Sequence, residues 1–124
     1  MIVVVIEGPT GRRLSDDLLD TGSDRTIFPE REAKSIGVPL PSDPHGSFKT
    51  AGGVSIAYRL ADVVLELRPS TGATVRWRTS VAFAEDPLSV IHLGYRGFLE
   101  YFHCTFHGPE RKVVLDPRPG LPRA

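Results

Sequence analysis

The 124-residue sequence predicts an all-β domain, and three features of the chain lead to this prediction. Most apolar residues occur in short runs of strand length, and one long run alternates between apolar and polar positions. Twelve glycines and eleven prolines separate these runs and supply turn signals. Apolar residues make up 40% of the chain, which is enough for the packed core of one domain of this length.

The N-terminal part of the chain is predicted to form a β-hairpin. Residues 2–6 are a run of isoleucine and valine, which favour strands. The segment 8–11, Gly-Pro-Thr-Gly, is a turn signal. We therefore expect residues 12–19 to return as the second strand and to deliver the chain to Asp20.

One short helix is predicted at residues 28–37. Pro29 suits the first helical position, acidic residues follow in the first turn, and Gly37 can end the helix in a left-handed conformation. The next stretch, residues 38–46, contains three prolines and is expected to be a loop.

Two longer strands are predicted in the middle of the chain. Residues 49–67 should form a hairpin arm that turns around Gly52 and Gly53. The strand after it alternates between apolar and polar positions, so its polar face, with Arg76 and Arg78, is expected in water. The opposite face of that strand carries Val75, Trp77, Thr79, Val81 and Phe83.

The C-terminal part is predicted to form a helical turn at residues 97–102, followed by a closing hairpin. The hairpin joins strands at residues 102–106 and 112–115 through a His-Gly-Pro-Glu turn. Residues 117–124 are rich in Pro and Arg and are expected to be a frayed tail. The chain is thus predicted to be one domain, residues 1–116, with a C-terminal tail.

The composition argues against several classes of function and location. Fifteen basic and fifteen acidic residues cancel, so no basic excess indicates a nucleic-acid or membrane partner. The single cysteine, Cys104, excludes an intrachain disulfide and fits a core thiol better than a nucleophile. The apolar run 1–6 is too short to cross a bilayer and lacks the features of a signal peptide, so a cytoplasmic location is expected.

No metal or cofactor is predicted. His103 and His107 share one face of a predicted strand, but four residues of strand separate them by about 13 Å, too far to bind one ion. The glycines of the segment 8–11 are not followed by the Gly-Lys-Ser/Thr ending of a phosphate loop. The sequence contains no Asn and no Gln, which excludes a Cys-His-Asn nucleophile system.

The main functional signal lies at Asp20, which follows the second predicted strand. Two leucines bring this strand out of the core, and Asp20 is followed by Thr21 and Gly22. A carboxylate held among apolar neighbours can act as a general base on water, and a glycine lets a second backbone approach closely. The segment 18–29 resembles the catalytic loop of the aspartic proteases, specifically the retropepsin-like branch to which the retroviral proteases belong.

Three further segments support the resemblance in the same order and spacing. Leu93 and Gly94 resemble the apolar–Gly segment that threads beneath the catalytic loop in this family. The two strands of the closing hairpin resemble the terminal strands that retroviral relatives use in their dimer sheet. Residues 49–58 resemble the flap, a hairpin that folds over bound substrate. The turn of this flap consists of Ala51, Gly52 and Gly53.

The resemblance implies a retropepsin-like acid protease fold, a small closed barrel with one or two short helices that pairs as a homodimer. It implies an endopeptidase that acts on a polypeptide substrate without a cofactor. Two close carboxylates share a single proton, and the motif occurs once, so each subunit supplies one Asp20 to a dyad that activates water. Thr21 is implied to grip the same loop of the partner, Gly22 and Ser23 to shape the loop, and Asp24 to bind substrate backbone.

Several positions depart from the family pattern. His92 stands where the threading segment usually carries an aliphatic residue. The arginine that commonly follows the glycine is displaced by Tyr95, which leaves open whether Arg96 reaches Asp24. Ser23 replaces the usual alanine, and its hydroxyl is expected to hydrogen-bond the Asp20 carboxylate and to favour the ionised form.

Two interpretations of the site remain open on the sequence alone. The first is an active protease, with apolar pocket walls near Phe28, Ile56, Val81 and Phe83. The second is a dimeric peptide-binding or structural module of the same fold without turnover, which the altered residues around Gly94 allow. The intact Asp-Thr-Gly favours the protease, because binding alone would not require that carboxylate.

Overall fold

The computed structural model describes residues 2–86, 88 and 90–124. Three residues therefore lie outside the described part: Met1 of the apolar run 1–6, Pro87, and Ser89, which precedes the segment with Leu93 and Gly94. The described part is mostly β-structure with one α-helix, which confirms the predicted fold class at this level. The strands in chain order are β1 (Ile2–Gly8), β2 (Gly11–Leu19), β3 (Ile27–Pro29), β4 (Gly46–Lys49), β5 (Ser55–Leu67), β6 (Val75–Ala84), β7 (His92–Leu93), β8 (Phe102–His107) and β9 (Lys112–Pro117).

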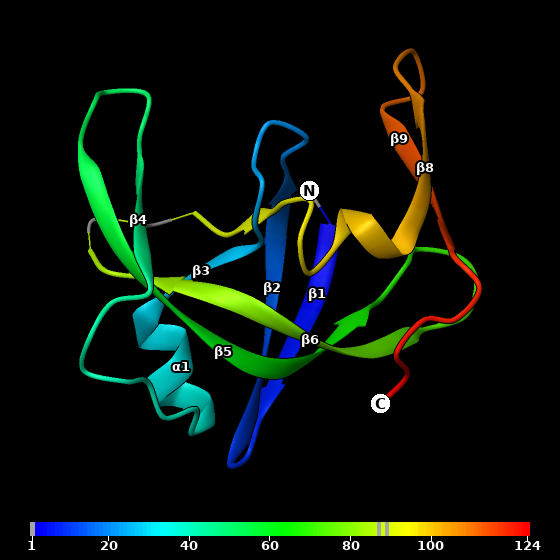
Figure 1. The fold of residues 1–124 in the computed structure, drawn as a ribbon. Coiled ribbons are helices and arrows are strands. Elements are labelled where there is room, and N and C mark those ends of the chain that lie inside the picture. The colour runs from blue at the N-terminus through cyan, green and yellow to red at the C-terminus, as the bar shows by residue number, and fades with distance from the viewer. Residues whose placement is uncertain (1, 87, 89) are drawn as a thin grey trace.

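A closed barrel of six strands forms the body of the molecule (Figure 1). The strands run in the order β1-β2-β7-β3-β6-β5, and antiparallel pairing of β1 with β5 closes the ring. The predicted N-terminal hairpin is present, since β1 and β2 pair antiparallel from Ile2↔Asp17 to Gly8↔Gly11. The barrel closes because β5 and β6 are long enough to curve around the core, as Figure 1 shows.

The main core fills the barrel from strands that alternate as predicted. Leu65 and Trp77 face each other across β5 and β6, and both are fully buried. The Trp77 indole N–H donates to the carbonyl of Gly97 over 3.0 Å, so its buried polar group is satisfied. Phe98 and Phe102 pack edge-on against Trp77, with ring centroids 5.5 and 5.2 Å away, which ties the segment after β7 to the barrel.

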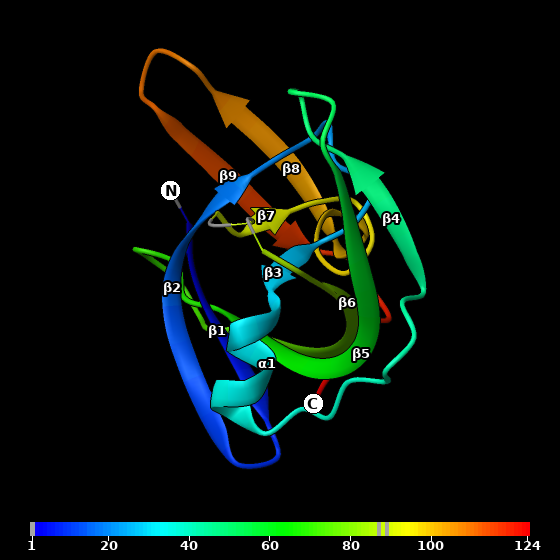
Figure 2. The same cartoon turned by 90° about the vertical axis from the view of Figure 1, so that its left-hand side faces the viewer.

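The predicted short helix is α1 (Glu30–Ile36). Pro29 lies one residue before it, in an extended conformation, and Gly37 ends it with a positive φ of 77°. Ala33 and Ile36 are fully buried, and Figure 2 shows the helix packed along the outside of the barrel. The helix is therefore held by its apolar face, because seven residues are too few to be stable alone.

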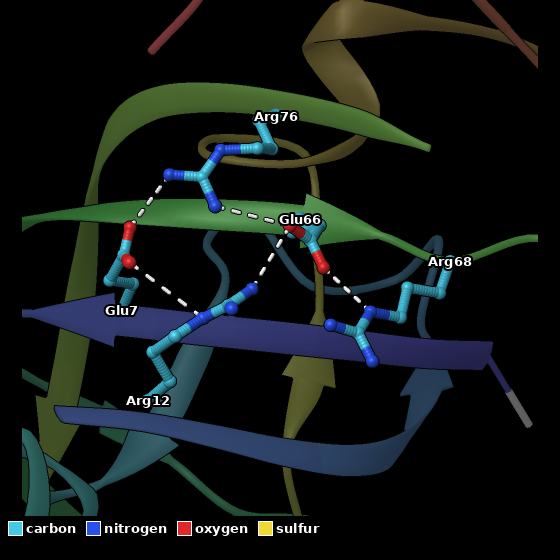
Figure 3. A network of polar contacts seen from close by, with 5 residues as sticks. All are labelled: Glu7, Arg12, Glu66, Arg68 and Arg76. Carbon is cyan, nitrogen blue, oxygen red and sulfur yellow. Dashed lines mark hydrogen bonds and ion pairs between the residues drawn. The ribbon is translucent and has the colours of Figure 1, made fainter. Parts of the chain in front are cut away.

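An ion-pair network spans the seam between β1 and β5 that closes the barrel (Figure 3). Glu66 accepts hydrogen bonds from Arg12 and Arg76, each over 3.1 Å, and from Arg68 over 2.6 Å. Burial disfavours the ionised Glu66, but the arginine hydrogen bonds outweigh it and hold the pKa of Glu66 below its usual value. Arg76 is partly exposed and also pairs with Glu7 over 2.7 Å, while Arg78 on the same face of β6 is exposed as predicted.

The hairpin of β8 and β9 forms a separate two-stranded sheet beside the barrel, as predicted. A 3₁₀ turn at Leu99–Tyr101 leads into it. The expectation of a frayed C-terminus is wrong. Leu121 is buried in the main core, and Arg78 donates its backbone N–H to the carbonyl of Pro122 over 2.8 Å. The chain end packs on β6 through two contacts: the apolar side chain of Leu121 enters the core, and the unpaired edge of β6 at Arg78 binds the backbone of the segment.

Within the described residues, no helix has the length and the apolar character that crossing a bilayer requires.

Candidate active site

Asp20 leaves the end of β2 and begins a short loop that connects to β3. Its backbone N–H donates to the carbonyl of Leu93 over 3.0 Å, which fixes the start of the loop to β7. Its carboxylate accepts the backbone N–H of Gly22 at Oδ1 over 2.9 Å. A Cβ at Gly22 would lie only 3.3 Å from this same oxygen, so glycine leaves the carboxylate room to fold back on its own loop.

The segment with Leu93 and Gly94 passes directly beneath this loop. Tyr95 and Arg96 donate their backbone N–H groups to the carbonyls of Ser23 and Asp24, each over 2.9 Å. A Cβ at Gly94 would collide with backbone atoms of the loop above it. Glycine is therefore required at this position, because the two backbones are in contact there.

His92 is the residue that the structure adds to the site. Its Nδ1 lies 3.1 Å from Oδ2 of Asp20, and both side chains are partly exposed. The contact arises because β7 pairs in parallel with β2, with His92 opposite Leu18, two residues before Asp20. The departure from an aliphatic residue was visible in the sequence, but its partner was not.

The hydroxyls of the loop do not contact the carboxylate. Ser23 Oγ donates to the carbonyl of Arg25 over 2.7 Å, so the expected hydrogen bond from Ser23 to Asp20 is not made. The turn of the loop brings the Ser23 side chain back toward its own backbone instead. Thr21 is exposed, and within the described part of the chain its hydroxyl makes no hydrogen bond.

A cleft of about 530 Å³ lies between this loop and the β4–β5 turn. The hairpin predicted at residues 49–58 as a possible flap is present, with Thr50 accepting the N–H of Gly53 over 2.9 Å and Gly53 at a φ of 81°. Ala51 lines the cleft, whereas Gly52 and Gly53 lie at the tip of the turn beyond the lining. The cleft is lined by Asp20, Gly22, Ser23, Asp24, Arg25, Ile27, Ser47, Phe48, Lys49, Thr50, Ala51, Tyr58, Ala82, Leu88 and His92.

The apolar wall of the cleft differs from the predicted one. Phe28, Val81 and Phe83 are buried in the main core and do not line the cleft. Their strand neighbours Ile27 and Ala82 line it instead, because successive side chains of a strand point to opposite faces. Ile56, Ala84 and Leu88 join these two residues in a small second core beneath the flap, which makes Ile56 a support rather than a wall.

Two arginines, Arg25 and Arg96, lie near the loop that follows β2. Arg96 reaches Asp24, with 3.8 Å between Nε and Oδ2, but both side chains are exposed and the pair is weak. Arg25 lies over the ring of Tyr58 at 5.7 Å, and both residues line the cleft. The position of Arg25 was not predicted, since no local pattern shows which loop side chains face the flap.

The structure also bears on the metal-ligand and thiol candidates of the sequence. Among the described residues, no three His, Cys, Asp or Glu side chains gather as metal ligands do. Cys104 lies on β8, where burial raises the pKa of its thiol above the ordinary value. A thiol that resists ionisation is a poor nucleophile.

Comparisons of the chain with protein-family models, with characterised proteins and with solved structures give no significant match.

Proposed function

We propose that the chain is one subunit of a retropepsin-like aspartic endopeptidase, which is active as a homodimer and needs no cofactor. The observation that carries the proposal is the setting of Asp20. Its carboxylate lies at the floor of a cleft beneath a glycine-tipped hairpin, and the Gly22 N–H holds one of its oxygens. The carboxylate is partly exposed, so it remains open to the cleft while its loop holds it, and a general base needs such a position.

In the proposed reaction, two Asp20 carboxylates share one proton across a two-fold axis. The ionised carboxylate takes a proton from water as the water oxygen attacks the peptide carbonyl carbon. The protonated carboxyl donates to the carbonyl oxygen, which forms a tetrahedral gem-diol. As this intermediate collapses, the C–N bond breaks, the protonated carboxyl donates its proton to the leaving amine, and the ionised carboxylate takes the proton of one gem-diol hydroxyl, so the dyad again holds one shared proton.

Several features on one side of the barrel support a partner chain. The loop after β2, the flap turn and the β8–β9 hairpin all project on this side in both views of the molecule (Figures 1 and 2). Phe106 and Val114 of the hairpin are 58% and 38% exposed, and they lie on opposite faces because Val114 pairs with Thr105. Leu18 and Val90, which precede Asp20 and His92 by two residues each, are also exposed. An apolar hairpin of this kind is stabilised when a second chain covers it.

A second candidate function has one observation in its favour. Oδ2 of Asp20, which the dyad needs for water, already contacts His92. A catalytically silent peptide-binding dimer of the same fold would tolerate this contact without consequence. Both candidate functions are compatible with the cytoplasmic location expected from the sequence. The free Cys104 is consistent with that location.

Cleavage of unfolded casein by the purified chain between pH 3.5 and 7 tests the protease. Asp20→Asn should lower the rate about a thousandfold, and Asp16→Asn, an exposed change of the same kind on β2, should leave it unaltered. Unchanged cleavage by the Asp20→Asn protein would falsify the mechanism. Absence of cleavage at every pH would favour the silent module.

A mixing experiment tests whether the site needs both subunits. When an equal amount of Asp20→Asn chain is added and allowed to exchange, about half of the wild-type chains should pass into mixed dimers. The activity should then fall to about half. Activity that stays constant would show that one Asp20 is sufficient, and the dyad would have to be abandoned.

A further inference from the structure

The direction of the His92 side chain follows from the alternation of side chains along β7, which lies between two neighbouring strands. Leu93, the second residue of the strand, is fully buried in the main core. His92, the first residue, must therefore point to the opposite side of the sheet, where it lines the cleft. β2 and β3 flank it, with Leu18 and Ile27 as its partners in register. The imidazole is thus held in place by the barrel rather than by a flexible loop.

The Asp20 carboxylate has one donor or partner for each oxygen in its own chain. Gly22 N–H donates to Oδ1 over 2.9 Å, and His92 Nδ1 lies 3.1 Å from Oδ2. One contact comes from the backbone of Gly22 and the other from the His92 side chain, and together they fix the orientation of the carboxylate. Each oxygen of an ionised carboxylate has a further lone pair, so water and a second carboxylate can still bind there.

We propose that His92 is a positioning residue for Asp20, with its Nδ1–H donating to Oδ2. This inference rests on the proposed protease activity of the same site. A donor on Oδ2 favours the ionised carboxylate, which is the form that accepts a proton from water. An aliphatic side chain at this position supplies no donor. His92 therefore restricts activity to a more acidic pH range than a chain with leucine there would have.

The other charged side chains that line the cleft with His92 and Asp20 are Asp24 and Arg25 of the loop and Lys49 of β4. Tyr58 of β5 is the remaining titratable group of the lining. Asp24 is paired with Arg96, and Arg25 lies over the Tyr58 ring, so their nearest partners are not the imidazole. Asp20 is the one charged side chain of the described residues within hydrogen-bond distance of His92.

The tautomer of neutral His92 tests the contact without any need for activity. In ¹⁵N-resolved NMR spectra near pH 8, His92 should carry its proton on Nδ1, because the tautomer is set by the hydrogen bond that the ring makes. The Asp20→Ala protein should lose this preference, while His103, which is exposed on β8, should look the same in both proteins. A wild-type His92 with its proton on Nε2 would overturn the proposal.

Kinetics of two variants test the consequence for catalysis. In His92→Leu, the bell-shaped profile of kcat/KM against pH should move about one pH unit higher, which is the scale of one hydrogen bond to a charged group. His92→Asn should stay near the wild-type profile, because its Nδ2 can supply the donor at the same distance from the backbone. Asp16→Asn, an exposed change on β2, is the control and should leave the profile in place.

The possible outcomes distinguish a failure of the proposed role of His92 from a failure of the proposed protease activity. If Asp20 is required for cleavage but His92→Leu keeps the wild-type profile, the role of His92 is wrong and the protease stands. If the Nδ1–H tautomer is found but the protein never cleaves peptides, the contact is real and the protease proposal fails. A circular-dichroism spectrum for each variant ensures that a lost activity does not reflect a lost fold.

Discussion

Replacing Asp17 with asparagine should stabilise the folded chain above pH 6 and change its stability little below pH 4. Asp17 lies on β2, three residues before Asp20, and is 0% exposed. Within the described residues, neither oxygen of its carboxylate has a hydrogen-bond partner. Burial raises the pKa of Asp17 from 3.8 to about 6; the nearby Ser15 side chain opposes this rise, and the charges of Asp16 and Glu32 add smaller increases.

The size and sign of the effect follow from this pKa. The folded chain holds the Asp17 proton more tightly than the unfolded chain does, so the fold loses stability as the pH rises from 3.8 through about 6. At about 1.4 kcal/mol for each pH unit, ionising Asp17 costs the folded state about 3 kcal/mol relative to the unfolded chain. Asparagine has nearly the same shape and does not ionise, so the Asp17→Asn protein does not lose this free energy of unfolding as the pH rises.

Urea unfolding of the two proteins from pH 3.5 to 8, at one protomer concentration, measures the effect. The free energy of unfolding of the Asp17→Asn protein, minus that of the wild type, should rise by about 3 kcal/mol over this range, mostly between pH 4 and 6. Any constant cost of burying the amide cancels in this comparison. Asp16→Asn, on the exposed face of the same strand, should show a nearly flat difference. A flat difference for Asp17→Asn would refute the argument that burial suppresses its ionisation.

Two further substitutions address the loop and the barrel seam. Gly94→Ala should lower the free energy of unfolding by about 3 kcal/mol, because its Cβ would collide with the backbone of Arg25. Thermal denaturation should show this loss, whereas Gly52→Ala, whose Cβ meets nothing closer than 3.8 Å, should melt near the wild type. Glu66→Gln should cost about 2–3 kcal/mol at pH 7, because three arginines lose their carboxylate. That cost should shrink in urea unfolding at pH 3, because the folded-state pKa of Glu66 is lowered and its contribution is lost as the wild-type carboxylate becomes protonated.

Local sequence signals were sufficient for the hairpins and the helix. The β4–β5 turn and the end of α1 each need a glycine for a local backbone conformation: Gly53 has a φ of 81° and Gly37 a φ of 77°. The alternation in β6 predicted its buried face for the same reason, since a strand's period does not depend on its partners. The packing of Leu121 was missed because a single apolar residue in a Pro- and Arg-rich segment carries no periodic signal.

The contents of the cleft depend on pairings between distant parts of the chain. His92 meets Asp20 because β7 inserts between β2 and β3, which joins residues 72 positions apart. Ile27 and Ala82 line the cleft, rather than Phe28 and Val81, for a related reason. Alternation in the sequence assigns neighbouring residues of these strands to opposite faces. Both faces carry apolar residues, so the sequence does not show which face points into the barrel and which lines the cleft.

The buried carboxylates place opposite limits on the pH range in which this fold is most stable. Glu66 has a lowered pKa, so its contribution is complete above the usual value of 4.5 and is lost as the pH falls through its folded-state value. Asp17 has a raised pKa, so its cost grows as the pH rises from 3.8 to about 6. Their sum is most favourable on the acid side of pH 6. Because Asp17 precedes Asp20 on β2, the strand that carries the proposed catalytic carboxylate is held best in the same weakly acidic range in which a shared-proton dyad would work. A wild-type stability, measured relative to an Asp17→Asn, Glu66→Gln double variant, that is highest near pH 8 would contradict this account of both residues.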